Sequence, residues 1–168
     1  MIPASRPRNY LQSALYVAIA GIVAAILIER LLAYAEVAEK AAMEATVGQL
    51  NNALYARLAY LALRGEYEAI EALPDESPFA TTDARSAAYL GEFDDAPPGG
   101  PESGTWYFDR GRRELVYMPR FKRYFFSADD GQAPSCARFV LEVRKSSTYA
   151  YTGAALRPAG AWRWDPQL

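Results

Sequence analysis

The chain has 168 residues, a formal net charge of −2 and no histidine. The absence of histidine removes the commonest general base and the commonest metal ligand, so a histidine-based catalytic dyad or triad is excluded. A near-neutral charge without a long basic run gives nucleic-acid binding little support. A nucleophile elbow, a phosphate-binding glycine loop and a cluster of metal ligands are also missing from the sequence. We therefore predict no enzymatic activity, no cofactor, no metal site and no nucleic-acid partner, and keep an anchored enzyme as an alternative.

A short polar segment, residues 1–9, precedes a long apolar run. Residues 14–28 (ALYVAIAGIVAAILI) carry no charge, and with residues 10–13 the run approaches the ~20 residues that cross a bilayer. We predict a transmembrane helix over residues 10–32. By the positive-inside tendency, the arginines that precede the run keep residues 1–9 in the cytoplasm and place the bulk of the chain outside the inner face.

Two other interpretations of this start stay open. A positive segment followed by an apolar run also describes a secretory signal peptide, and Ala33-Tyr34-Ala35 supplies a small-x-small cleavage site. A helix buried in a soluble core is the other alternative. The charged pair Glu29-Arg30 separates the apolar run from that cleavage site, and the helical pattern crosses the site without a break. We therefore favour a membrane anchor.

The helical pattern continues into the soluble part of the chain. Strong helix formers predominate after Glu29, so residues 33–73 are predicted as an amphipathic continuation, with Gly65 as a cap or kink and Pro74 as a stop. Glu36 and Glu39 are predicted to be solvated charges. Apolar side chains at spacings of three or four residues share one face, where we expect the C-terminal region to dock: Val47, Leu50, Leu54, Leu58 and Leu61.

Small residues are frequent in the predicted membrane helix. They let neighbouring membrane helices approach closely, so we take them as candidate packing residues. The alternative is that alanine and glycine are simply common in spanning helices. The candidates are Ala18, Ala20, Gly21, Ala24 and Ala25.

Residues 74–104 are predicted as a loop-rich connection. Prolines and glycines are frequent there, interrupted by an apolar island at residues 87–90. Such connections usually lie over a scaffold. We expect four side chains to pin this one to the helix: Phe79, Tyr89, Leu90 and Phe93.

Residues 105–168 are predicted as an antiparallel β-sheet region, so the fold class is α+β with one long N-terminal helix packed on a small antiparallel sheet. Residues 105–108 and 114–118 flank a turn, which indicates a hairpin. In residues 137–145, three apolar side chains share the face that we expect to pack on the helix: Phe139, Leu141 and Val143. Further extended segments are predicted at 120–127, at 148–156 and, as an edge or lid, at 162–164.

The remaining polar and aromatic residues favour structural roles. Cys136 is the only cysteine, so an intramolecular disulfide is excluded. We predict a small buried or strand-edge residue there, with an intermolecular disulfide or a reactive thiol as the alternative. The aromatic residues suit a core and the membrane interfaces better than a ligand site. Several aspartates lack the spacing of a calcium loop: Asp94, Asp95, Asp129, Asp130 and Asp165.

This order of elements resembles the type IV pilin and type II secretion pseudopilin families. The local sequences Tyr89-Leu90-Gly91-Glu92 and Gly104-Thr105-Trp106-Tyr107-Phe108-Asp109, with the Pro/Gly-rich connection between them, look like the pseudopilin segment in which an extended loop leads into the first strands. The resemblance implies a structural subunit or assembly factor. It would lie in the bacterial inner membrane with a periplasmic domain, and its partners would be other pilin-like subunits or secretion and pilus assembly proteins.

The family signature for leader cleavage is missing. If Tyr10 is aligned with the first mature residue, Asn9 stands where these families have glycine and Ala14 stands where they have glutamate. We therefore expect the leader to be retained, and a filament contact through that glutamate does not carry over. A membrane-anchored periplasmic accessory that binds a partner without entering a filament is the alternative.

Overall fold

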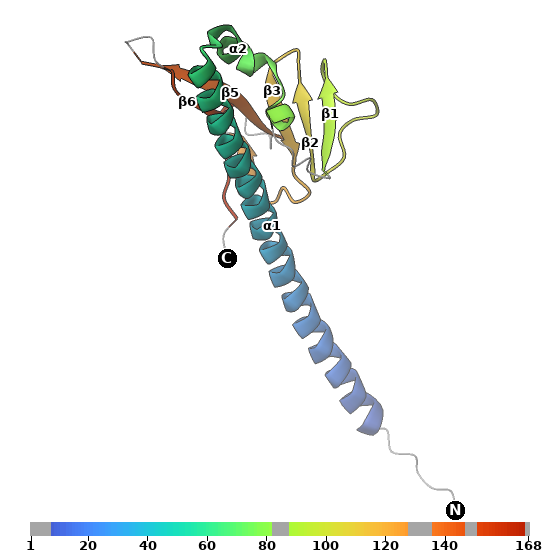
Figure 1. Ribbon diagram of the computed structural model, residues 1–168. Helices are drawn as coiled ribbons and strands as arrows, with labels where there is room; N and C mark the ends of the chain where they lie inside the picture. Colours follow the sequence, from blue (N-terminus) through green and yellow to red (C-terminus); the bar gives the residue numbers. More distant parts are fainter. Residues whose placement is uncertain (1–7, 82–87, 128–135, 147–150, 167–168) are drawn as a thin grey trace, which may run out of the picture.

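The computed structural model describes residues 8–81, 88–127, 136–146 and 151–166. One helix, α1 (Arg8–Arg64), forms the axis of the molecule, and a β-sheet packs beside its C-terminal half while its N-terminal half projects away from the sheet (Figure 1). At 1.5 Å per residue, α1 is about 85 Å long. The predicted α+β class, a long N-terminal helix packed on a small sheet, is confirmed.

Gly65 caps α1, which agrees with the prediction of a cap or kink there, but the helix does not continue to residue 73. The amide of Gly65 donates to the carbonyl of Ala62 at 3.1 Å, and the amide of Glu66 donates to the carbonyl of Leu61 at 3.0 Å. These two hydrogen bonds form a Schellman cap. Gly65 takes the left-handed conformation that this cap requires, with φ of 71°. The helix therefore stops at Arg64, and the rest of the predicted continuation forms separate short helices: α2 (Tyr67–Ala72), η1 (Leu73–Asp75) and η2 (Pro78–Thr81).

The main sheet has the strand order β1-β2-β3-β5-β6. Its central hairpin, β2 with β3, pairs Thr105 with Met118 and Asp109 with Glu114, as the sequence predicts. The remaining pairs are antiparallel except for the first, because β1 runs parallel to β2. The strands are β1 (Tyr89–Phe93), β2 (Thr105–Asp109), β3 (Glu114–Met118), β5 (Ala137–Lys145) and β6 (Tyr151–Pro158).

A parallel edge strand was not predicted. β1 lies inside the segment that was expected to be a loop-rich connection, and residues 94–104 carry the chain back to start β2 in the same direction. The amide of Trp106 bonds to the carbonyl of Ala88 at 2.8 Å, which joins the start of the two strands.

Two short strands make a second sheet. β4 (Phe125–Ser127) pairs antiparallel with β7 (Trp162–Trp164), and Trp164 is buried. The predicted strand over 120–127 is thus only its last three residues, and the predicted edge or lid at 162–164 is β7. Parts of three predictions lie outside the described residues. They are residues 1–7 of the predicted cytoplasmic segment, residues 148–150 of the predicted last strand, and Asp129 and Asp130.

The core lies between α1 and one face of the main sheet. Leu54 and Leu115 are 0% exposed, and Trp106 contacts both Tyr117 and Phe139 at ring-centroid distances of 4.6 and 6.0 Å. At the far edge of the sheet, α1 covers β6, since the side-chain oxygen of Asn51 accepts the amide hydrogen of Leu156 at 2.7 Å. This contact occupies an edge-strand donor that would otherwise be open to pairing with another chain.

Candidate functional site

The N-terminal half of α1 is not covered by the folded domain. Its apolar window has a mean hydropathy of 2.3 and none of it is buried, so it is compatible with a transmembrane span by length and composition. Large apolar side chains on every side of the helix are at least half exposed, among them Tyr10, Ile19, Val23 and Leu27. An apolar surface of this extent in a folded protein marks contact with a membrane or with other proteins.

The small residues proposed for helix packing all lie in this uncovered half. Ala18, Ala20, Gly21, Ala24 and Ala25 are exposed, and nothing approaches Gly21 within 4 Å of a Cβ built there. At 100° per residue these positions fall within an arc of about 160° on the helix, and the large side chains Ile19, Ile22, Val23 and Ile26 occupy the opposite arc. Over residues 18–26 the helix therefore presents one smooth face and one bulky face, and the large side chains Val17 and Ile28 border the smooth face at its two ends.

The domain is attached to α1 by two carboxylates one turn apart, which we call the carboxylate clasp. Glu39 accepts hydrogen bonds from the Tyr117 hydroxyl at 2.8 Å and from the backbone amides of Arg120 and Phe121 at 2.7 and 3.0 Å. Charge-assisted bonds of this kind are roughly twice as strong as neutral ones. Glu39 thus fixes the chain that follows β3 to the middle of the helix.

Glu36 completes the clasp. It is 2% exposed, and its Oε1 accepts from the Trp164 indole at 2.9 Å and from the Tyr124 amide at 2.9 Å. The prediction that Glu36 and Glu39 are solvated charges is wrong, because both carboxylates are used as acceptors for donors of the domain. Together they join α1 to the chain after β3 and to β7.

The clasp has a signal in the sequence. Stepping back from Val47 by four, four and three residues leads to Met43, Glu39 and Glu36, so the two carboxylates lie on the same face as the apolar stripe. Met43 is buried. Acidic residues that continue a buried stripe are candidates for carboxylates that accept hydrogen bonds inside the fold. The prediction of solvated charge did not use this pattern.

The pKa of the Tyr117 hydroxyl is raised in the folded protein. Burial, and then the hydrogen bond to the Glu39 carboxylate, raise the pKa of its hydroxyl above the ordinary value of 10.0. The phenol therefore stays protonated as a donor to Glu39 at any physiological pH.

Gly104 makes room for the same region. Its φ is 80°, its amide donates to the Met118 carbonyl at 2.5 Å, and the guanidinium of Arg120 occupies the place of a Cβ. A Cβ here would move only the Arg120 guanidinium, the end of a flexible side chain, so the positive φ is the stronger reason for glycine. Glycine is therefore favoured beside the clasp.

The predicted helix–sheet residues lie in one hydrophobic cluster. Leu50, Leu54, Leu58 and Leu61 are buried on the helix, Phe139 and Leu141 on β5, and Val47 and Val143 are partly buried against them. The prediction missed the larger aromatic contribution from the hairpin and from β7. Those buried residues are Trp106, Phe108, Tyr117, Phe125 and Trp164.

Of the four residues expected to pin the connection to the helix, two do so. Phe79 is buried and stacks on Tyr89 at a centroid distance of 4.4 Å. Leu90 is 40% exposed, which contradicts the expectation, and Phe93 packs on the opposite face of the sheet beside Tyr107. Alternation along β1 explains Leu90, because a strand sends successive residues to opposite faces. Phe93 changes face because β1 carries a register shift between Tyr89 and Glu92, where three residue steps on β1 face two on β2.

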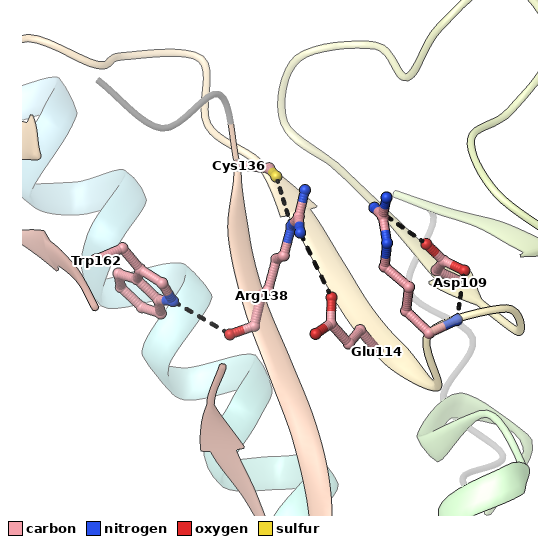
Figure 2. A network of polar contacts seen from close by, with 6 residues as sticks. Asp109, Glu114, Cys136, Arg138 and Trp162 are labelled. Carbon is pink, nitrogen blue, oxygen red and sulfur yellow. Dashed lines mark hydrogen bonds and ion pairs between the residues drawn. The ribbon is translucent and has the colours of Figure 1, made fainter. Parts of the chain in front are cut away.

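Polar side chains join neighbouring strands on the face of the sheet away from α1 (Figure 2). Arg138 Nε donates to the sulfur of Cys136 at 3.5 Å and its guanidinium lies 3.8 Å from Glu114. On the α1 side of the sheet, Trp162 packs against the core and its indole donates to the Arg138 backbone carbonyl at 3.2 Å. Asp109 accepts from the Arg112 amide at 3.0 Å and shapes the hairpin turn. Cys136 is buried beside Tyr107 and Val116, in agreement with a structural role.

Among the described residues, no group of three or more cysteine or carboxylate side chains could hold a metal ion. Asp94, Asp95 and Asp165 are not brought together into such a group. Comparison with protein-family models, with curated proteins and with solved structures finds no match to this chain.

Proposed function

We propose that this protein is a pilin-like or pseudopilin-like structural subunit or assembly factor of a type IV pilus or type II secretion filament. It acts by packing the N-terminal half of α1 against the same helix of neighbouring subunits. The observation that carries the proposal is the division of one unbroken helix into an uncovered apolar half and a half that is built into an α+β domain.

The distribution of side-chain size on α1 supports packing between helices. The smooth face formed by Ala18, Ala20, Gly21, Ala24 and Ala25 allows close backbone approach, which favours van der Waals packing between helices in a bilayer. The bulky face is suited to lipid. The exposed side of α1 beyond the membrane also carries small residues, including Ala38, Ala41, Ala45 and Gly48, so the same approach can continue into the soluble half.

The clasp supports the same role. A subunit held in an assembly by its helix transmits force between helix and domain, and a domain tied to α1 at Glu36 and Glu39 cannot swing independently of it. In this proposal the chain crosses the bacterial inner membrane once, with the N-terminus in the cytoplasm and the domain in the periplasm.

The alternative is a membrane-anchored periplasmic accessory that binds a partner but does not enter a filament. It is favoured by one observation, the alanine at position 14 where filament-forming relatives in the resembled families carry a glutamate.

Affinity purification of the full chain from bacterial membranes in mild detergent tests the proposal. Pilin-like proteins or pilus and secretion assembly proteins are expected to co-purify. Exchange of Ala20 and Ala24 for leucine, which roughens the smooth face, is expected to reduce their recovery, whereas exchange of Ile19 and Ile26 for leucine on the bulky face leaves it unchanged. Recovery of the intact protein alone, as a monomer, would overturn the subunit role and favour the accessory.

A further inference from the structure

A hollow lies at the end of the uncharged part of α1, between the helix and the residues just before β4. The hollow measures about 260 Å³ and combines an apolar side chain, two arginines and an acidic residue. It is lined by Ile26, Glu29, Arg30, Ala33, Arg123 and Tyr124.

The position of this hollow relative to the membrane follows from the sequence of α1. The uncharged run ends at Ile28, and the hydrocarbon layer cannot extend far beyond it without burying Glu29 and Arg30. Headgroups occupy about 5 to 7 Å on each side of a 30 Å hydrocarbon core. Arg123 contacts Glu29 at 3.3 Å and so lies in that layer, whereas Glu39 is about 15 Å further along the helix and lies above it.

The charges exposed at this level are mainly positive. Arg30, Lys122 and Arg123 are exposed, and among the described residues no carboxylate lies within 4.0 Å of the first two. Glu29 is already engaged by Arg123. The Glu36 carboxylate is buried and accepts from Tyr124 and Trp164, so it does not face the hollow as an open acceptor. Within the described part of the chain, Asp165 is a second exposed acid in this region, and its amide bonds to the Tyr124 carbonyl at 3.0 Å.

These positive charges are brought to the membrane boundary by folding. Lys122 and Arg123 lie more than ninety residues after Glu29, so they do not take part in the loop-charge rule that orients the helix. Arginine side chains offer fork-shaped donors that match phosphate oxygens, and their apolar stems lie well against a headgroup layer. Tyrosine is also common at this depth, as Tyr34 and Tyr124 illustrate.

We propose that this hollow binds the headgroup phosphate of an anionic phospholipid, with Arg30 and Arg123 as donors and Lys122 adding positive charge beside them. Ile26 then contacts the first part of the acyl chains. A zwitterionic lipid is disfavoured because its cationic headgroup would lie against arginine. The inference rests on the proposed membrane anchoring, and it adds that the domain stands on the membrane surface in a fixed orientation.

The test compares the full chain in lipid nanodiscs of phosphatidylcholine alone with nanodiscs that also contain phosphatidylglycerol. Thermal unfolding is followed by tryptophan fluorescence, which reports on the fold because Trp106 and Trp164 are buried and Trp162 is partly buried. Because a ligand that binds only the folded state stabilises it, the midpoint is expected to rise with phosphatidylglycerol by about 4 to 8 °C. At 1 M salt, where the screening length is about 3 Å, most of this rise should disappear.

The variant Arg30→Gln with Arg123→Gln removes the two donors, and the variant Arg112→Gln with Arg113→Gln removes the same charge from the turn between β2 and β3. The first is expected to lose the phosphatidylglycerol-dependent rise while unfolding cooperatively in phosphatidylcholine, and the second to keep the rise. An equal rise in both variants, or none in the original chain, would overturn the lipid site. Failure of the original chain to enter either nanodisc would instead overturn the membrane anchor.

Discussion

At the scale of single residues, the clasp makes Glu36 a structural acceptor. Glu36→Ala leaves the Tyr124 amide and the Trp164 indole without a partner in a buried place, and we expect a loss of about 3 kcal/mol in the free energy of unfolding. Chemical denaturation of the chain in detergent micelles measures it.

Glu44→Ala is the matched control on the same helix. Glu44 is exposed, and among the described residues it pairs with Lys40 alone, at 3.8 Å, so a change of at most about 0.5 kcal/mol is expected. Similar losses for the two variants would show that Glu36 does not hold the domain.

Tyr117 gives the clasp a pH dependence. Its pKa is raised in the folded protein, so above pH 10 the unfolded chain releases a proton that the folded chain retains, and stability falls as the pH rises. Below pH 10 the contribution is fully present. The variant Tyr117→Phe should lose less stability than the original chain between pH 9 and about pH 11.

The control for this titration is Tyr55→Phe, which removes a hydroxyl from an exposed position on α1. Its alkaline loss of stability should follow that of the original chain. If Tyr117→Phe also follows the original chain, the hydroxyl does not titrate against the Glu39 carboxylate.

At the scale of elements, the face of α1 against the sheet carries the core. Leu54→Asp places an unpaired charge at a position that is 0% exposed, and a loss of about 4 kcal/mol or more is expected. Asn52→Asp, on the exposed face of the same helix, should change stability by about 0.5 kcal/mol or less. Equal effects at the two positions would contradict the packing described for α1.

The sequence carries enough information to predict this face of α1 but not what surrounds it. Leu50, Leu54 and Leu58 recur with a helical period that any packed helix must show. The clasp is different, because the donors to Glu36 and Glu39 include backbone amides, which every residue has and which leave no side-chain pattern. Strand β1 was missed for a related reason, since Gly91 and the prolines near it resemble a loop when read without the neighbouring strand.

At the scale of the whole molecule, the proposed topology puts the domain outside the cytoplasm. Ser103 is exposed in the segment between β1 and β2, and Ser103→Cys in a Cys136→Ser background offers one accessible thiol. A membrane-impermeant maleimide should label it in spheroplasts. Labelling that appears only after lysis would mean that the helix has the opposite orientation.

In the proposed function, the smooth face of α1 contacts other protein helices in the membrane, and site-specific photo-cross-linking in bacterial membranes can detect those contacts. A small diazirine-bearing amino acid is placed at position 20 or 24 on the smooth face, and at position 19 or 26 on the bulky face. We expect protein adducts with pilin-like partners or with a second copy from positions 20 and 24, and mainly lipid adducts from positions 19 and 26. Equal protein adducts from both faces, or lipid adducts alone from all four positions, would contradict it.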